Sequence, residues 1–139
     1  YSPYTHAGGY AYRRGYTEEA NRQVLAGIII ESIDAIENVE AIADEPELDF
    51  VYIGTYDISV KLGLAGQTRH PAVKEVLRDC VEKVRANGKA AGCLYHCPKE
   101  LDFFREIGIQ LLAYKVDANV LFEGFAFVQK LKDKPVVTL

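Results

Sequence analysis

Short apolar runs alternate with amphipathic segments along most of this chain, and that alternation limits the fold more than any other feature. The runs are strand-sized and continuous in apolar character, as expected when helices cover a parallel sheet. Strands that alternate with helices form βαβ units with right-handed crossovers. The expected fold class is therefore α/β with about four βα units, and the expected strands are residues 27–30, 49–53, 90–94 and 110–114.

Segments with apolar residues at helical spacing separate these strands. The clearest expected helix begins at His70-Pro71, where proline at the first helical position gives up no hydrogen bond, and ends near Gly88. We expect a long loop between residues 54 and 70, and a short helix near residues 18–24. The other expected helices are residues 33–43, 98–107 and 119–131.

Composition narrows the class of partner. The net charge of -4 over 139 residues provides no basic face for nucleic acid or for an anionic membrane. No apolar run reaches membrane-spanning length, and no signal peptide is recognisable. Three cysteines, at positions 80, 93 and 97, suit free thiols in a reducing cytoplasm. The chain has no methionine, so it need not be a complete translation product.

Two carboxylates follow the first two expected strands. Glu31 ends the first strand, and Asp57 comes shortly after the second. Because the C-terminal ends of parallel strands meet at one mouth, we expect both carboxylates there. Carboxylate oxygens suit Mg2+ or Mn2+, and a cation held by only two of them keeps positions for the oxygens of a 2-oxo acid. Alternatively, both acids are helix N-caps or first-turn residues favoured by the helix dipole.

Several short motifs occur in an order that resembles the HpcH/HpaI family of metal-dependent (class II) pyruvate aldolases. The resemblance covers nearly the whole chain and implies a TIM-type (β/α)8 barrel, a fold that needs about 250 residues. Residues 1–139 would be the C-terminal half of that barrel, with the N-terminal half absent from this chain. The motifs are Gly27-Ile28-Ile29-Ile30-Glu31, the run from Asp49 to Ser59, Leu62-Gly63, Gly66, His70-Pro71, the run from Gly88 to Gly92, and Val116-Asp117.

The resemblance also implies roles for individual residues. Glu31 and Asp57 fall on the two metal-binding carboxylates of the family, and the backbone around Tyr56 falls where the family contacts the pyruvate carboxylate. Ile29 stands where the family has a glutamine that contacts the 2-oxo acid. Tyr56 replaces a small residue, so we expect its ring to enter the mouth, and Lys115 replaces a glycine. These departures bear on which substrate is bound.

The implied function is that of a carbon–carbon lyase that cleaves or forms a 4-hydroxy-2-oxo acid from a pyruvate enolate and an aldehyde. The family's acid/base pair and catalytic arginine lie outside this chain, so turnover would need a partner chain that carries the missing half-barrel. Family members are oligomers with swapped C-terminal helices, and we expect a homo-oligomer here. Two alternatives stay open: a non-catalytic partner subunit or fragment that kept the fold, and a metal-dependent condensing enzyme acting on a sugar acid.

A cluster after the third expected strand offers two further hypotheses. Cys93, His96 and Cys97 lie within five residues, but a closed zinc site usually takes four ligands, and no second pair is present. Packing at the strand end is therefore the expected role of the thiols. His96 is a weak candidate for a catalytic group, and a partly buried, hydrogen-bonded histidine is the alternative.

Overall fold

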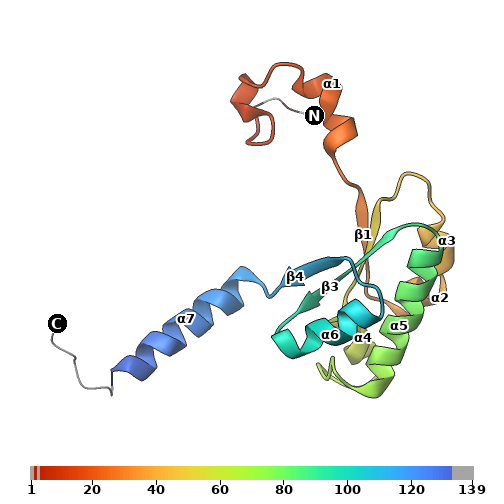
Figure 1. Ribbon diagram of the computed structural model, residues 1–139, viewed down its shortest axis with the longest axis vertical. Coiled ribbons are helices and arrows are strands. Elements are labelled where there is room, and N and C mark those ends of the chain that lie inside the picture. Colours follow the sequence, from red (N-terminus) through yellow and green to blue (C-terminus); the bar gives the residue numbers. More distant parts are fainter. Residues whose placement is uncertain (1, 3, 133–139) are drawn as a thin grey trace.

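The computed structural model describes residues 2 and 4–132, and it forms a parallel sheet with helices on one side (Figure 1). The four strands are parallel and lie in sequence order, β1-β2-β3-β4. The expectation of four βα units is thus confirmed. In chain order the elements are η1 (Gly9–Ala11), α1 (Tyr16–Gln23), β1 (Gly27–Ile30), α2 (Ile33–Glu37), α3 (Val39–Ala43), β2 (Phe50–Ile53), α4 (Thr55–Lys61), α5 (Pro71–Ala86), β3 (Ala90–Tyr95), η2 (Pro98–Glu100), α6 (Leu101–Glu106), β4 (Leu111–Tyr114) and α7 (Asp117–Leu131).

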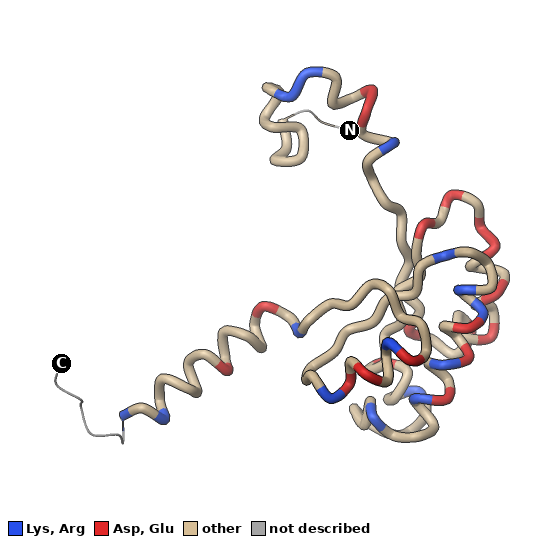
Figure 2. The backbone as a smooth tube through the Cα atoms, in the orientation of Figure 1, with Lys and Arg blue, Asp and Glu red and all other residues tan. Residues whose placement is uncertain are grey.

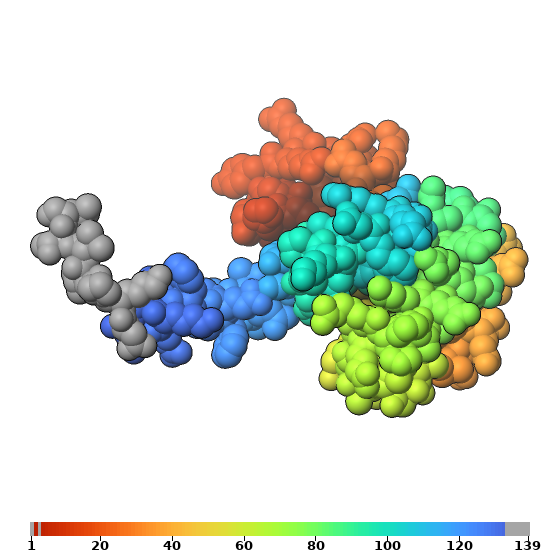
Figure 3. Space-filling model, turned by 60° about the horizontal axis from the view of Figure 1, so that its bottom comes forward, coloured from red at the N-terminus to blue at the C-terminus, as the bar shows by residue number. Residues whose placement is uncertain are grey.

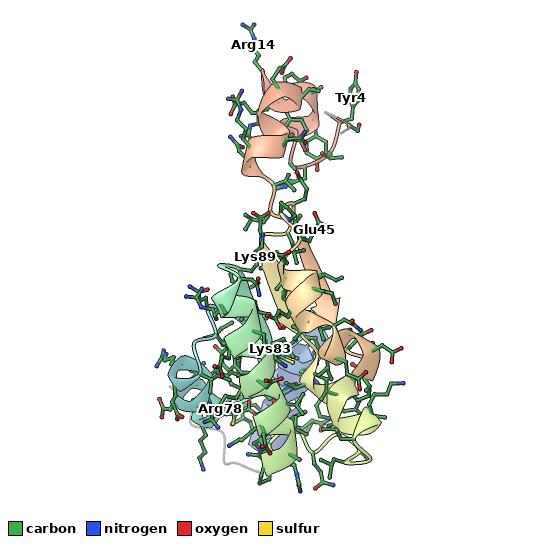
Figure 4. All side chains as sticks on the ribbon, turned by 90° about the vertical axis from the view of Figure 1, so that its right-hand side faces the viewer. Tyr4, Arg14, Glu45, Arg78, Lys83 and Lys89 are labelled. Atoms are coloured by element: carbon green, nitrogen blue, oxygen red, sulfur yellow. The ribbon has the colours of Figure 1, made fainter. Side chains whose placement is uncertain are left out.

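One face of the sheet carries the core. Because side chains alternate along a strand, the row Ile30, Ile53, Cys93 and Leu112 points to the side where α3, α5 and α6 pack. Helix α5 contributes its buried stripe to this core, and Figure 4 looks onto that side, with Arg78 and Lys83 labelled on α5. The buried residues of the α5 stripe are Val73, Leu77, Cys80, Val81 and Val84.

The opposite face, called the open face below, is not covered by helices. Its central row is Ile29, Tyr52, Gly92 and Leu111, which are partners in the sheet register. Ile29 is 57% exposed and Leu111 is 42% exposed. The ring of Tyr52 lies over Gly92, where an added Cβ would come within 2.8 Å of Tyr52 Cδ2. The open face is therefore apolar but largely without a partner within the described residues.

The two ends of the described chain project away from the sheet. The N-terminal segment with η1 and α1 stands apart from the body (Figure 1), and α7 extends in another direction as an arm, which Figure 3 also shows. Charged residues lie mainly on the helices that cover the core, whereas the middle of α7 carries few (Figure 2). Large apolar side chains of α7 are exposed, with Phe122 at 75% and Phe125 at 67%. None of the described helices is long and apolar enough to cross a membrane.

The structure corrects two expectations about helices. The stretch expected to be a long loop contains α4, which is short and includes residues of low helix propensity. Ile58 and Ser59 of α4 are buried, so packing supplies the stability that propensity does not. The expected helix over residues 33–43 is two short helices, because Asn38 ends the first by donating from Nδ2 to the carbonyl oxygen of Asp34 at 2.7 Å.

Candidate metal and substrate site

The C-terminal ends of the four strands meet at one edge of the sheet, and the candidate site lies there. Glu31 follows β1, and the turn from Gly54 leads into α4 after β2. His96 follows β3, and Asp117 begins α7 after β4. Because all four strands are parallel and adjacent, these groups share one end of the sheet.

Glu31 lies on the open-face side of this edge. The residue continues the alternation of Gly27 and Ile29, and its side chain is close to Gly54 on the neighbouring strand end. A Cβ added to Gly54 would lie 3.1 Å from Glu31 Cβ and 3.6 Å from Glu31 Oε2. The glycine therefore allows the close approach of the Glu31 side chain at its Cβ, and the Gly54 N–H donates to the carbonyl oxygen of Ile30 at 2.8 Å.

Glu31 is not the cap of the helix that follows it. Ser32 is the N-cap of α2, and its Oγ accepts from the backbone N–H of Ala35 at 3.2 Å. The Glu31 side chain is exposed and makes no hydrogen bond or ion pair with the residues the structure describes. The capping interpretation therefore does not account for Glu31.

Asp57 lies in the first turn of α4, so the dipole interpretation keeps its force for this residue. Gly54, the N-cap of α4, contributes no side-chain hydrogen bond. The carboxylate of Asp57 is exposed and, like that of Glu31, is free of ion pairs within the described part of the chain. Two carboxylates on neighbouring strand ends are thus available as ligands.

The donor set fits a hard divalent cation bound on one side only. No group of three or more histidine, cysteine or acidic side chains gathers as a metal site among the described residues. Two carboxylates without competing partners suit Mg2+ or Mn2+ that completes its coordination with water or substrate oxygens. The space that Gly54 leaves for Glu31 is the observation that supports this fit.

The side chain of Tyr56 is exposed, and one edge of its ring has a defined neighbour. The ring packs against Gly66 in the loop between α4 and α5, where an added Cβ would lie 3.1 Å from Tyr56 Cε2. Gly66 has a positive φ of 80°, and its N–H donates to Ser59 Oγ at 2.9 Å. Ser59 Oγ in turn donates to the carbonyl oxygen of Tyr56 at 2.6 Å. The buried Ser59 thus ties the loop to α4, a function that the sequence motifs did not reveal.

Ile29 lies on the open face one alternation before Glu31, and its side chain is more than half exposed. An apolar side chain therefore stands beside the candidate metal site, where it can contact but cannot hydrogen-bond a bound molecule. Neighbouring Tyr52 is half-buried, and burial, followed by the nearby Cys93, raises the pKa of its phenol. The open face near the site is consequently apolar and uncharged.

His96 and Cys93 both lie on the helix-covered side of the sheet, but at different depths. Cys93 is fully buried in the core, and burial raises the pKa of its thiol to about 12. Cys93 Sγ donates to the carbonyl oxygen of Leu94 at 3.4 Å, so packing rather than zinc binding describes its surroundings. His96 is exposed and lines a cleft with Arg69 and Glu100 on the helix side of the strand ends.

Lys115 and Asp117 complete the edge at β4. Lys115 has a positive φ of 49°, a conformation that favours glycine, the residue expected here from the family pattern. Its ammonium group pairs with Glu123 of α7, and this hydrogen bond raises the pKa of Lys115. Asp117 is the first residue of α7, and its Oδ1 accepts from the N–H of Ala118 at 2.7 Å.

The chain is similar in sequence to several proteins that are named as aldolases. A 4-hydroxy-2-oxo-heptane-1,7-dioate aldolase of Salmonella arizonae is 34% identical over 109 residues, which are 78% of this chain and 41% of that protein. A 4-hydroxy-2-oxovalerate aldolase of Rhodococcus jostii is 35% identical over 106 residues, or 76% of this chain and 41% of that protein. The chain thus spans less than half the length of these relatives.

Solved structures agree with the sequence comparison. An HpcH/HpaI aldolase/citrate lyase family protein from Burkholderia cenocepacia has a TM-score of 0.79 at 26% identity, over 96% of this chain and 52% of that one. An HpcH/HpaI aldolase from Desulfitobacterium hafniense has a TM-score of 0.76 at 26% identity, over 89% of this chain and 49% of that one. The four βα units are accordingly the second half of a TIM-type barrel. The sequence pattern of the HpcH/HpaI aldolase/citrate lyase family matches residues 4–123, and this chain belongs to that family.

Proposed function

We propose that residues 1–139 are the C-terminal half-barrel of a metal-dependent aldolase. The reaction is the cleavage or formation of a 4-hydroxy-2-oxo acid, with a pyruvate enolate and an aldehyde as the other side of the equilibrium. Relatives named as aldolases of such acids support this reaction class. The observation that carries the proposal is the Glu31 carboxylate, which lies beside Gly54 at the C-terminal edge of the sheet and has no ion-pair partner among the described residues.

Glu31 and Asp57 would hold Mg2+ or Mn2+ in this proposal. Such a cation, when bound, polarises the oxygen of a 2-oxo acid and stabilises the negative charge of its enolate. The backbone at Tyr56 binds the carboxylate of the 2-oxo acid, while Ile29 gives an apolar wall on the open face.

The other half of the barrel is the partner that this chain needs. Within the described residues β1 pairs only with β2 and β4 only with β3, so both outer strands have a free edge. A half-barrel with strands on both of those edges would cover the open face and bring in the acid/base groups and the arginine. The chain alone is therefore expected to bind metal without turning over substrate.

Exposed phenylalanines on α7 support a homo-oligomer. All three of Phe122, Phe125 and Phe127 are well over half exposed. An apolar patch of this kind on a helix marks a surface that another protein covers. In the proposed assembly this helix packs on a neighbouring subunit.

The three free thiols suit a reducing compartment such as the cytoplasm.

The test measures Mn2+ binding by calorimetry and pyruvate release from a 4-hydroxy-2-oxo acid, with and without EDTA. The complete protein is compared with its Glu31→Gln and Asp57→Asn variants, and with Glu37→Gln and Asp102→Asn, which remove exposed acids elsewhere. Loss of a residue that only orients a metal ligand typically weakens metal binding about 10–100-fold. Each site variant removes a proposed ligand itself, so its Mn2+ affinity should fall by more than that. The two controls should bind and react as the parent does.

Two outcomes would redirect the proposal. Failure of the complete protein to bind Mn2+ would leave a non-catalytic subunit that kept the fold as the better account. Metal binding with condensation of a larger sugar acid, but without simple pyruvate release, would favour a condensing enzyme. Ile29 is the feature that makes the second outcome worth measuring, because it offers a bound 2-oxo acid no hydrogen bond.

A further inference from the structure

A small cavity lies on the helix-covered side of the strand ends, away from the open face that carries Glu31. It is enclosed between the end of β3, the start of α5 and the segment η2–α6. The deep part is apolar, and Leu77 and Phe104, which line it, also belong to the core. The four apolar lining residues are Leu77, Leu94, Phe103 and Phe104.

The rim of this cavity is cationic. Arg69, Lys74 and Lys99 all line it, and none of the three forms an ion pair with the residues that the structure describes. Lys74 Nζ lies 4.7 Å from the centre of the Phe103 ring, which keeps that charge at the cavity wall. Three cations from different elements thus surround one opening.

The one acidic residue in the lining is already engaged. Glu100 Oε2 accepts from the backbone N–H of His96 at 2.7 Å and from that of Cys97 at 3.1 Å. These hydrogen bonds hold the Glu100 carboxylate against the turn before η2, and its single negative charge offsets only part of the positive charge of the three rim cations. A rim of three cations and one hydrogen-bonded carboxylate attracts an anion.

The volume limits what enters. The enclosed part of the cavity has a volume of about 50 Å³. One water molecule occupies about 10–15 Å³ of such a volume, so the cavity has room for about four heavy atoms. The cavity shares Thr68, Arg69, His96 and Glu100 with a wider cleft of about 540 Å³ that opens to solvent.

We propose that this cavity binds a short-chain monocarboxylate, with its apolar tail among Leu77, Phe103 and Phe104 and its carboxylate between Arg69 and Lys99. A guanidinium group binds a carboxylate with two parallel hydrogen bonds, and the exposed rim leaves both cations free to close on it. Inorganic phosphate fits less well, because it would leave the apolar floor unfilled. The assignment does not depend on the metal site or on the aldolase reaction.

The test is a calorimetric titration of the full-length protein with acetate, butanoate, octanoate, inorganic phosphate and neutral butan-1-ol. EDTA is present throughout, so that no metal at the open face holds a carboxylate. Affinity should rise about fourfold for each added methylene from acetate to butanoate, the ratio that corresponds to burial of one CH₂. The gain should stop before octanoate, whose tail exceeds the enclosed volume, and phosphate and butan-1-ol should bind more weakly than butanoate.

Charge variants locate the binding. Arg69→Gln and Lys99→Gln should each weaken butanoate binding about tenfold, the effect of losing one charged hydrogen-bond partner. Lys61→Gln and Arg105→Gln remove exposed cations that do not line the cavity and should leave binding unchanged. The proposal is overturned if no carboxylate binds, if chain length has no effect, or if the control variants weaken binding as much as the rim variants do.

Discussion

The two faces of the four-stranded sheet come from the same strands and yet have opposite surroundings. Ile30, Ile53 and Cys93 are fully buried on the side of α3, α5 and α6, whereas Ile29 and Leu111 at the two ends of the opposite row are exposed. A sheet that has helices on one face and water on the other usually alternates apolar and polar residues along each strand. Because the open row is also apolar, the difference shows that the chain is built to be covered on that side as well.

The strongest test of this contrast compares two adjacent isoleucines. In the chain of residues 1–139, Ile30→Ala should lower the free energy of unfolding by about 2–4 kcal/mol, since it empties a packed core position. Ile29→Ala should cost less than about 1 kcal/mol, because its side chain is already 57% exposed. Urea unfolding followed by circular dichroism gives both values.

The same pair sharpens the comparison in the complete protein. There, Ile29→Ala should cost more than it does in residues 1–139 alone, because the proposed other half-barrel would cover the open face around this side chain. Equal costs for the two variants in residues 1–139 alone would mean that the open face is covered within this chain. That result would remove the structural argument for a partner half-barrel.

The arm formed by α7 poses the same contrast on a smaller scale. Phe122→Ser and Phe125→Ser each remove an exposed ring and should raise the dissociation constant of a homo-oligomer at least about tenfold, if the ring is an anchor of the interface. Gln129→Ser on the same helix is the control and should change little. Sedimentation velocity over a range of concentrations measures the effect, and an unchanged distribution in both phenylalanine variants would count against an α7 interface.

The sequence predicted the sheet well because its signal is local. Continuous apolar runs located all four strands to within a residue or so, and Pro71 located the start of α5. Helix α4 escaped prediction because contacts outside the helix hold it, namely the burial of Ile58 and Ser59 and the hydrogen bond from the Gly66 N–H to Ser59 Oγ. Local propensity could not reveal a helix that depends on a loop seven residues further on.

The candidate site divides in the same way. The position of Glu31 at a strand end follows from the apolar run before it, and that position was predictable. The direction of the Tyr56 ring was not, because it is set by Gly66, whose open space beside the ring becomes visible only in three dimensions. Strand order therefore places the carboxylates, while loop packing decides what surrounds them.

The cysteines give the smallest and most selective contrast, because the test replaces only Cys97, which lies outside the core. Cys80 and Cys93 lie in the core behind the covered face, and burial raises the pKa of their thiols to about 11 and about 12. Thiolate is the reactive form, and at pH 8 only about one Cys80 thiol in a thousand is ionised. Cys97, at the strand end, is partly exposed. A disulfide reagent at pH 8 should therefore modify one thiol per folded chain quickly and the other two only after denaturation. Cys97→Ser should abolish the fast phase, and rapid labelling of two or three thiols would mean that the helices open from the covered face far more readily than its packing implies.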